Sequence, residues 1–319
     1  MAAKPRIAQL GPMAGSESAD RRLDEAYDVL KLWQAPDPAA LLREHGAGIE
    51  VLVTNAVLGC RGAVMEAMPD LRAICCWSVG YDSLDLAAAR RLGLQIGNTP
   101  NASTDCVADL AWGMLLACAR GIGAGERLVR DGRWAGGAGL PLGIRVSGKK
   151  LGVLGLGRIG RAVAARAAGF SMEVRYHGRR RIPDAAWGFE ANLAALAGWA
   201  DFLVVAAAGG EATRGLVGAG VLRALGPRGI LVNVARGSVV DEAAVQALLA
   251  SGELGGAALD VFEHEPCVPE ALARSDRAVV LPHIGSATLE AREAMVDELM
   301  HNIDTYFRTG RLATPVELA

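Results

Sequence analysis

The sequence predicts an α/β protein with doubly wound parallel sheets, because short apolar runs alternate with helical patterns along the chain. The runs are continuously apolar and rich in β-branched residues, which is typical of parallel strands covered on both faces. The chain has 319 residues, a length that favours two domains over one. Hydrophobic residues make up 51% and charged residues 21%, a balance typical of a folded globular protein.

Charge and hydropathy exclude several classes of partner. The net charge of -2 provides no global field that would attract nucleic acid or anionic lipid. No stretch approaches the roughly 18 uninterrupted apolar residues of a membrane span, and the N-terminus shows no signal core. We therefore expect a cytoplasmic protein with no nucleic-acid or membrane partner. The six cysteines form no CxxC pair, and no His/Cys/Asp/Glu cluster has metal-ligand spacing, so we expect no metal.

The pattern of runs and caps predicts individual elements. We expect strands at residues 7–10, 51–53, 73–77, 151–154, 172–176, 202–205, 230–234 and 278–281. We expect helices at residues 84–92, 103–119, 161–168, 242–251 and 289–309. Asp82 or Ser83 is the expected cap of the first of these helices, and Asp241 of the fourth.

A turn-rich stretch at 98–101 indicates a crossing between domains. We expect residues 1–99 and 288–319 to form one domain, with residues 100–287 inserted as a second. The chain would begin in the first domain, build the second, and return.

A glycine-rich segment follows the expected strand at 151–154 and precedes a helical pattern. Its members are Gly155, Leu156, Gly157, Arg158, Ile159 and Gly160. In this context the first glycine allows a tight turn, the second lets the backbone approach a pyrophosphate, and the third lets helix and strand pack closely. The alternative is a plain glycine-rich turn. The flanking strand and helix favour a Rossmann-like domain that binds NAD or NADP at the helix N-terminus.

The next strand decides between the two cofactors. NAD enzymes usually place a carboxylate there for the ribose 2′-hydroxyl, but this strand is followed by His177, Gly178 and three arginines. Arg179 and Arg180 offer planar forks suited to a 2′-phosphate. The alternative is a solvated basic loop. The missing acid favours NADP, with NADPH preferred over NADH.

Three later segments each place an ionisable residue just past a strand, where ligands of open α/β sheets bind. They are Asn233–Gly237, Ala258–Pro266 and Leu281–Thr288. Together with Val153–Gly160 and Ser78–Asp82, these segments resemble the signatures of the D-2-hydroxyacid dehydrogenases, and the resemblance runs from about residue 50 to about residue 308. It implies a Rossmann-like cofactor domain inserted into a flavodoxin-like substrate domain.

The resemblance implies a role for each ionisable residue. His283 would give a proton to the substrate carbonyl oxygen, and Glu265 would orient and stabilise the imidazolium. Arg236 would bind the substrate carboxylate and carbonyl. Taken singly, each residue has an ordinary alternative as a surface or loop group, and His264 is a rival to His283. Taken jointly with the glycine segment, they indicate a catalytic site.

The resemblance also implies which further groups bind ligands. Backbone N–H groups of Val79 and Gly80 would hold the substrate carboxylate, and Asp260 would face the nicotinamide end of the cofactor. The remaining expected cofactor contacts are Thr104, Ala207, Thr213, Val234, Ala235 and Ser286, with Arg236 and His283 lining the same site. One departure from the family is Ala208, where proline is frequent.

These observations predict an oxidoreductase that reduces a small 2-oxo acid, of the glyoxylate or hydroxypyruvate type, to the D-2-hydroxy acid with NADPH. The Gly-Arg-Arg run resembles the NADPH-dependent reductases of the family. The alternatives are an NAD-preferring phosphoglycerate or lactate-type dehydrogenase, and a nucleotide-sensing corepressor. Because the helix at 103–119 is apolar on more than one face, and this region forms the subunit interface in the family, we expect a homodimer. Tyr81, Trp134 and Leu140 are candidate pocket walls.

Overall fold

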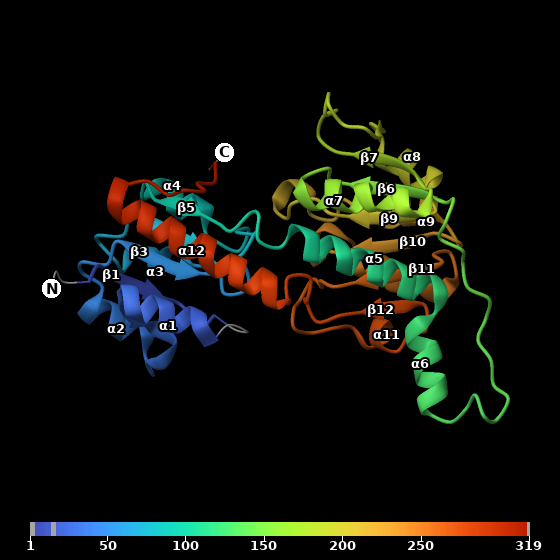
Figure 1. Cartoon of the computed structure of the whole chain (residues 1–319), viewed down its shortest axis with the longest axis horizontal. Helices are drawn as coiled ribbons and strands as arrows, with labels where there is room; N and C mark the ends of the chain where they lie inside the picture. Colours follow the sequence, from blue (N-terminus) through green and yellow to red (C-terminus); the bar gives the residue numbers. More distant parts are fainter. Residues whose placement is uncertain (1–3, 14–16, 318–319) are drawn as a thin grey trace. The chain divides into compact units, whose positions relative to one another are not determined.

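The computed structural model describes residues 4–13 and 17–317 (Figure 1). The chain divides into two compact units, one of residues 1–103 with 287–319 and one of residues 104–286. This division falls four residues later than the expected first crossing and one residue earlier than the second. Asn101 and Ala102 belong to the first unit because the backbone N–H of Asn101 contacts Glu298 and Ala102 packs on that unit's core.

The first unit is a five-stranded parallel sheet in the order β2-β1-β3-β4-β5. This is the flavodoxin-like order of doubly wound folds. The strands are β1 (Arg6–Gln9), β2 (Asp28–Lys31), β3 (Val51–Thr54), β4 (Ala73–Cys76) and β5 (Gln95–Gly97). The helices are α1 (Glu17–Ala26), α2 (Pro38–His45), α3 (Gly62–Glu66), α4 (Leu86–Arg91) and α12 (Leu289–Thr309). Leu23 of α1 and Met295 of α12 enter the core on one face, and Leu42 of α2 and Met65 of α3 enter the core on the other.

The second unit is a seven-stranded parallel sheet in the order β12-β11-β10-β9-β6-β7-β8. Counted within the unit, this is the 3-2-1-4-5-6 order of the Rossmann fold with one more strand at the edge. The strands are β6 (Lys150–Leu154), β7 (Glu173–His177), β8 (Gly188–Phe189), β9 (Phe202–Val205), β10 (Ile230–Asn233), β11 (Gly256–Leu259) and β12 (Ala278–Val280).

Helices cover both faces of this second sheet. They are α5 (Thr104–Arg120), α6 (Ile122–Arg130), α7 (Arg158–Arg166), α8 (Leu193–Trp199), α9 (Ala219–Leu225), α10 (Glu242–Ser251) and α11 (Glu270–Ala273). Trp112 of α5 and Val163 of α7 belong to the core on one face, and Leu196 of α8 and Leu248 of α10 belong to the core on the other. Figure 1 shows α6 and the segment after it extending away from this sheet.

The predicted fold class is confirmed, with differences at particular elements. All eight expected strands are present, but β2, β5, β8 and β11 were not predicted, because the first three have only two to four residues and β11 consists of a glycine, two alanines and a leucine. The cap expected at Asp82 or Ser83 is wrong. Asp85 caps α4 by accepting a hydrogen bond from the Ala88 N–H at 2.9 Å. The expected cap at Asp241 is confirmed by its bond to the Ala244 N–H.

The apolar helix α5 is mainly a core helix. Seven of its residues are buried in its own unit, among them Trp112 and Leu115. In the described part of the chain, no single helix is long and apolar enough to cross a membrane, and only α5 and α6 taken together across a 64° bend pass that test. Within the same described residues, no group of three or more His, Cys, Asp or Glu side chains is arranged to hold a metal ion.

Candidate active site

The glycine loop joins β6 to α7 at the carboxyl edge of the second sheet. Gly155 has a φ of +91°, which favours glycine, and a Cβ on Gly160 would lie 2.0 Å from the Gly155 carbonyl oxygen. A Cβ on Gly157 would meet no atom within 4 Å, and Gly157 provides no side-chain cap for α7. The space beside Gly157 at the start of α7 is therefore open, and the first N–H groups of a helix have no partner within the helix, which fits a dinucleotide pyrophosphate.

The basic loop after β7 lies beside this glycine loop. The Gly155 N–H donates to the His177 carbonyl oxygen at 2.9 Å, so the two loops share a backbone bond. Arg179 and Arg180 are exposed. Neither forms an ion pair with any carboxylate in the part of the chain that the structure describes, which leaves both guanidinium groups available to a phosphate.

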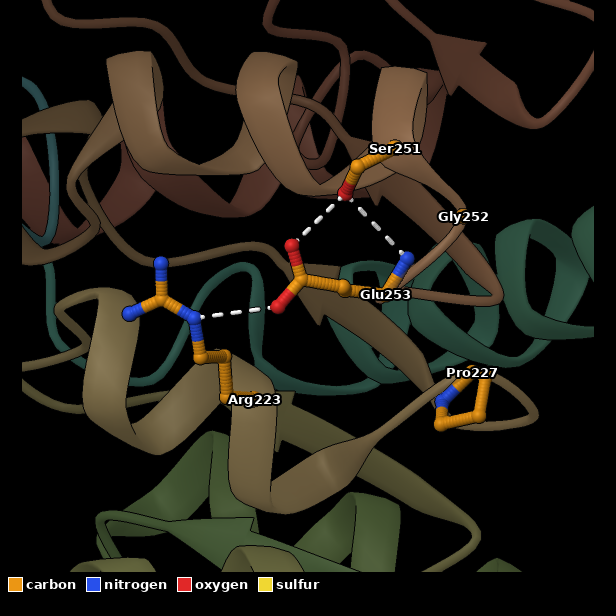
Figure 2. A pocket seen from close by; sticks show the side chains of 5 residues that line it. All are labelled: Arg223, Pro227, Ser251, Gly252 and Glu253. Atoms are coloured by element: carbon orange, nitrogen blue, oxygen red, sulfur yellow. Dashed lines mark hydrogen bonds and ion pairs between the residues drawn. The ribbon is translucent and has the colours of Figure 1, made fainter.

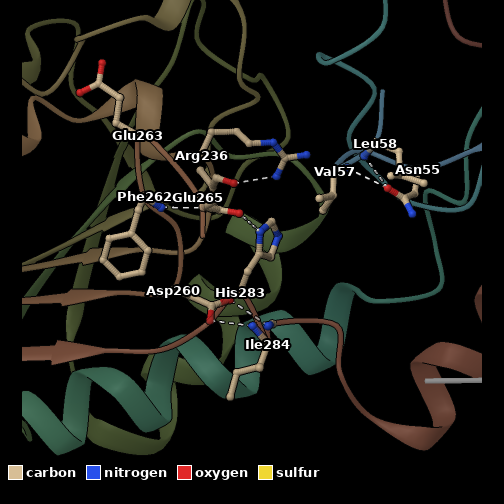
Figure 3. A network of polar contacts seen from close by, with 12 residues as sticks. Asn55, Val57, Leu58, Arg236, Asp260, Phe262, Glu263, Glu265, His283 and Ile284 are labelled. Carbon is tan, nitrogen blue, oxygen red and sulfur yellow. Dashed lines mark hydrogen bonds and ion pairs between the residues drawn. The ribbon is translucent and has the colours of Figure 1, made fainter. Parts of the chain in front are cut away.

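Two loops bring Glu265 and His283 together. Glu265 lies after β11 and His283 after β12, and Nδ1 of His283 is 2.7 Å from Oε2 of Glu265 (Figure 3). The other carboxylate oxygen accepts the backbone N–H of Phe262 at 3.0 Å. The side chain of Glu265 is 28% exposed and that of His283 is 34% exposed. Because an ionised carboxylate only accepts, Nδ1 of His283 is the donor, which leaves Nε2 for a ligand.

The environment keeps Glu265 ionised. Burial by itself would raise the pKa of Glu265, but the hydrogen bonds from His283 and Phe262 and the positive charge of Arg236 outweigh it, so the pKa is lowered. The charged carboxylate therefore holds the ring of His283 through Nδ1 and fixes its orientation.

Asp260 braces the turn that carries the histidine. Its two carboxylate oxygens accept the backbone N–H groups of Ile284 and Gly285, each at 2.8 Å (Figure 3). Asp260 is 2% exposed; burial raises its pKa, and these two backbone bonds lower it in part. His283 itself has a φ of +54°, a left-handed conformation that needs surrounding support. Asp260 supplies that support, and its expected contact with the nicotinamide stays a prediction.

Asn233 holds the arginine loop, a role that the sequence analysis missed. Its side-chain amide accepts the Ala235 N–H and donates to the Arg236 carbonyl oxygen, both at 3.0 Å. The next residue, Gly237, lies so close to the Phe262 backbone that a Cβ would be 1.9 Å from its carbonyl carbon. The Arg236 loop is therefore packed directly on the segment that positions Glu265. Only the position of Asn233 at the end of β10, three residues before Arg236, indicated this role.

Comparison with known proteins identifies the family of this chain. Residues 112–285 match the family described as D-isomer specific 2-hydroxyacid dehydrogenase, NAD binding domain. The chain belongs to this family. Glyoxylate/hydroxypyruvate reductase A of Arabidopsis thaliana is 40% identical over 94% of this chain and 96% of its own length. The family consists of NAD(P)-dependent 2-hydroxyacid dehydrogenases.

Two solved structures agree over nearly the whole chain. A 2-hydroxyacid dehydrogenase from Ketogulonicigenium vulgare is 44% identical with a TM-score of 0.91, covering 99% of each chain. An NADPH-dependent glyoxylate/hydroxypyruvate reductase from Sinorhizobium meliloti, solved with NADP and malonate, is 36% identical with a TM-score of 0.92. It covers 99% of this chain and 98% of its own. Both domains of the dehydrogenase fold are thus matched.

The remaining predicted cofactor residues of this dehydrogenase lie in the second unit, together with the glycine loop. Ala207 follows β9, Val234 and Ala235 follow β10, Ser286 follows β12, Thr213 lies in the loop after Ala207, and Thr104 begins α5. The hydroxyl of Thr213 donates to the Ala208 carbonyl oxygen at 2.8 Å and so ties down the loop where the family often has proline. Apart from Thr104, these residues gather beyond the carboxyl ends of the strands.

The loop that the sequence analysis expects to bind the substrate lies in the first unit. Asn98 donates from its side chain to the Val79 carbonyl oxygen at 2.7 Å, and the Ser78 hydroxyl donates to the Gly80 carbonyl oxygen at 2.7 Å. These bonds engage the carbonyl groups of both residues. They hold the loop at two points, which suits binding through its backbone N–H groups.

A surface cavity of about 340 Å³ lies elsewhere in the second unit (Figure 2). Its polar side chains satisfy one another: Arg223 donates to Glu253 at 3.1 Å, and Ser251 donates to the same carboxylate at 2.9 Å. It contains none of the predicted site residues. We therefore assign the chemistry to the strand ends and not to this cavity.

Proposed function

We propose that this dehydrogenase reduces a small 2-oxo acid of the glyoxylate or hydroxypyruvate type to the D-2-hydroxy acid, with NADPH as the preferred cofactor. The observation that carries the proposal is the 2.7 Å contact between Glu265 and His283 beside the braced Arg236 loop. The named activity of the Arabidopsis and Sinorhizobium relatives supports the substrate class.

In the proposed reaction His283 is the acid. It donates the proton on Nε2 to the substrate carbonyl oxygen, where negative charge develops. Glu265 holds Nδ1–H, fixes the ring and stabilises the imidazolium before the transfer. When bound, the nicotinamide supplies the hydride to the carbonyl carbon.

Substrate binding is assigned to one side chain and one backbone segment. The guanidinium of Arg236 binds the carboxylate and carbonyl oxygens through its planar fork. The N–H groups of Val79 and Gly80 bind the carboxylate as well. Two sets of donors on one carboxylate select 2-oxo acids over simple ketones and aldehydes.

Cofactor binding is assigned to the glycine loop and the strand ends. The start of α7 binds the pyrophosphate, and Arg179 and Arg180 bind the 2′-phosphate. The other expected contacts, from Thr104 to Ser286, line the nicotinamide and ribose halves. The lack of a carboxylate after β7 and the two exposed arginines support the preference for NADPH.

Steady-state kinetics on a small panel tests this proposal. Glyoxylate, hydroxypyruvate and phenylpyruvate are each reduced with NADPH and with NADH, and kcat/KM is compared. We expect the highest values with NADPH and the two small acids. A preference for NADH would favour the lactate or phosphoglycerate type. No turnover together with tight nucleotide binding would favour a nucleotide-sensing protein.

We also propose a homodimer. Because seven residues of α5, including most of its large apolar ones, are buried in its own unit, we assign the interface to α6 and the segment after it, which carry several exposed apolar side chains. Val129 is 57% exposed, Trp134 67% and Leu142 100%, and a hollow of about 290 Å³ lies beside Trp134 and Leu140. A second copy would bury this surface. Sedimentation checks this, with a monomer of about 33 kDa at micromolar concentration as the contrary result.

A further inference from the structure

Tyr176 connects strand β7 to the loop that carries the arginines. Its ring is 1% exposed and packs in the core of its unit, with its centroid 5.3 Å from that of Phe189. Its hydroxyl oxygen accepts the backbone N–H of Ile182 at 2.7 Å, and the hydroxyl donates to the carbonyl oxygen of the same residue at 3.4 Å. One buried side chain therefore binds both backbone groups of Ile182.

The four residues between these attachments, Gly178–Arg181, form no helix or strand, and the three arginines are exposed. The segment begins at the end of β7, where the His177 carbonyl oxygen accepts the Gly155 N–H and Nδ1 of His177 contacts the Glu190 carbonyl oxygen at 2.9 Å. It ends at Ile182, where Tyr176 is the side chain that binds the backbone. Hydrogen bonds thus hold the basic segment at both ends, and Tyr176 makes the bonds at its second end.

A loop that is already ordered loses less conformational freedom when a ligand binds it. The exposed arginine side chains still have to be ordered on a phosphate, so the backbone that carries them determines how much further ordering is needed. Removing the tie at Ile182 would leave the chemistry of the arginines intact. It would add the ordering of the backbone to the free-energy cost of binding.

We propose that Tyr176 is a positioning residue for cofactor specificity, which acts by holding Ile182 and thereby presenting Arg179 and Arg180 to the 2′-phosphate. The inference rests on the proposed preference for NADPH. Because NADH has a hydroxyl where NADPH has the phosphate, the effect of Tyr176 falls on NADPH alone. A residue that only stabilised the domain would affect both cofactors alike.

The test is the Tyr176→Phe variant, which keeps the ring against Phe189 and removes only the hydroxyl. Tyr306→Phe is the matched control, since Tyr306 is also a buried tyrosine, and its hydroxyl binds Glu50 within the first unit, away from the basic segment in the sequence. kcat/KM for NADPH and NADH is measured in each protein. Binding of adenosine 2′,5′-bisphosphate and of AMP provides a readout that does not depend on turnover.

Losing one such hydrogen bond predicts a fall of about three- to tenfold in the NADPH to NADH ratio. The affinity for adenosine 2′,5′-bisphosphate should fall by a similar factor, while NADH, AMP and the control variant stay unchanged. Adding Tyr176→Phe to Arg179→Ala with Arg180→Ala should then cause no further change in the ratio, because Tyr176 acts through those residues.

Three results would overturn the inference. An equal loss for both cofactors would make Tyr176 a structural residue only. An unchanged ratio in a wild-type protein that prefers NADPH would overturn this inference and leave the proposed function standing. A wild-type protein without any preference for NADPH would overturn the proposed cofactor choice, and this inference with it.

Discussion

Glu265 binds two partners at once, with Oε2 2.7 Å from Nδ1 of His283 and Oε1 3.0 Å from the backbone nitrogen of Phe262. The second contact fixes the carboxylate to its own loop, so the first contact fixes the imidazole of a different loop. The carboxylate of Asp260 accepts the two backbone N–H groups that follow His283 and so holds its main chain. The histidine is therefore oriented both through its ring and through its main chain, as a proton donor to a small substrate requires.

Removal of His283, the proposed proton donor, should abolish most of the activity. His283→Ala is expected to lower kcat by about 10²–10⁴-fold, the range for loss of a general acid. NADPH binding, measured by fluorescence titration, should persist. The matched control is His264→Ala, because His264 is exposed and lies next to Glu265 in the sequence. Near-full activity in His283→Ala combined with an inactive His264→Ala would reverse the assignment.

The pH profile should report on Glu265. Because its pKa is lowered, the carboxylate stays ionised at neutral and mildly acidic pH. Its contribution to activity and stability is then lost only as the pH falls through the lowered pKa. Glu265→Gln removes the carboxylate that titrates, so reduction should be slower, and the loss of activity at acid pH that follows protonation of Glu265 should be absent. Glu263→Gln, a change at an exposed neighbour, should leave the profile where it is; an identical profile for both variants would contradict this role.

Arg236 should not tolerate a change that keeps only its charge. Arg236→Lys loses the planar fork that binds carboxylate and carbonyl oxygens together. We expect KM for the 2-oxo acid to rise and kcat to fall, while the dissociation constant of NADPH changes little. Initial-rate kinetics over a range of substrate concentrations measures both parameters. Wild-type kinetics in this variant would remove Arg236 from the substrate site.

Asn233 should matter through Arg236. It is 1% exposed, and Asn233→Ala removes both bonds that shape the loop. Leaving a buried backbone group without a partner costs about 1–3 kcal/mol, so the melting temperature should fall. If the amide also positions Arg236, KM for the 2-oxo acid and the dissociation constant of oxalate should rise more than that of NADPH. A lower melting temperature with unchanged oxalate binding would mean that Asn233 only stabilises the fold.

Cofactor choice should respond to the basic loop. Arg179→Ala with Arg180→Ala should weaken NADPH by about ten- to a hundredfold and NADH little, since each charge-assisted bond is worth about 1.5–3 kcal/mol. Adding Gly178→Asp should move the preference toward NADH. The new side chain has room, because a Cβ there would lie 4.0 Å from the nearest atom, the Arg180 carbonyl oxygen. The preference of the wild type for NADPH over NADH should also shrink at high salt, because salt screens an exposed ion pair. If neither salt nor these substitutions changed the preference, the arginines would be only a solvated loop.

Much of the fold was predictable because its signals are local. Buried strands such as Phe202–Val205 are continuous apolar runs, and a helix such as α12 has a threonine cap at one end and a glycine at the other. The strands that were missed lack that signal: β2 is only half-buried, and β8 has two residues. The cap of α4 was misplaced because three candidate residues occur close together in the sequence, and only the chain path selects Asp85.

The sequence by itself determined the order of strands and helices, the glycine loop, and the ionisable residues that follow β10, β11 and β12. These depend on spacing between near neighbours, which is visible in one dimension. Only the tertiary structure decided that Asp260 binds the turn 24 residues ahead, that Asn233 holds Arg236, and that the Tyr176 hydroxyl reaches Ile182. Such bonds form where separate turns and loops meet, and their 2.7–3.0 Å geometry depends on side-chain direction and packing that no local pattern encodes.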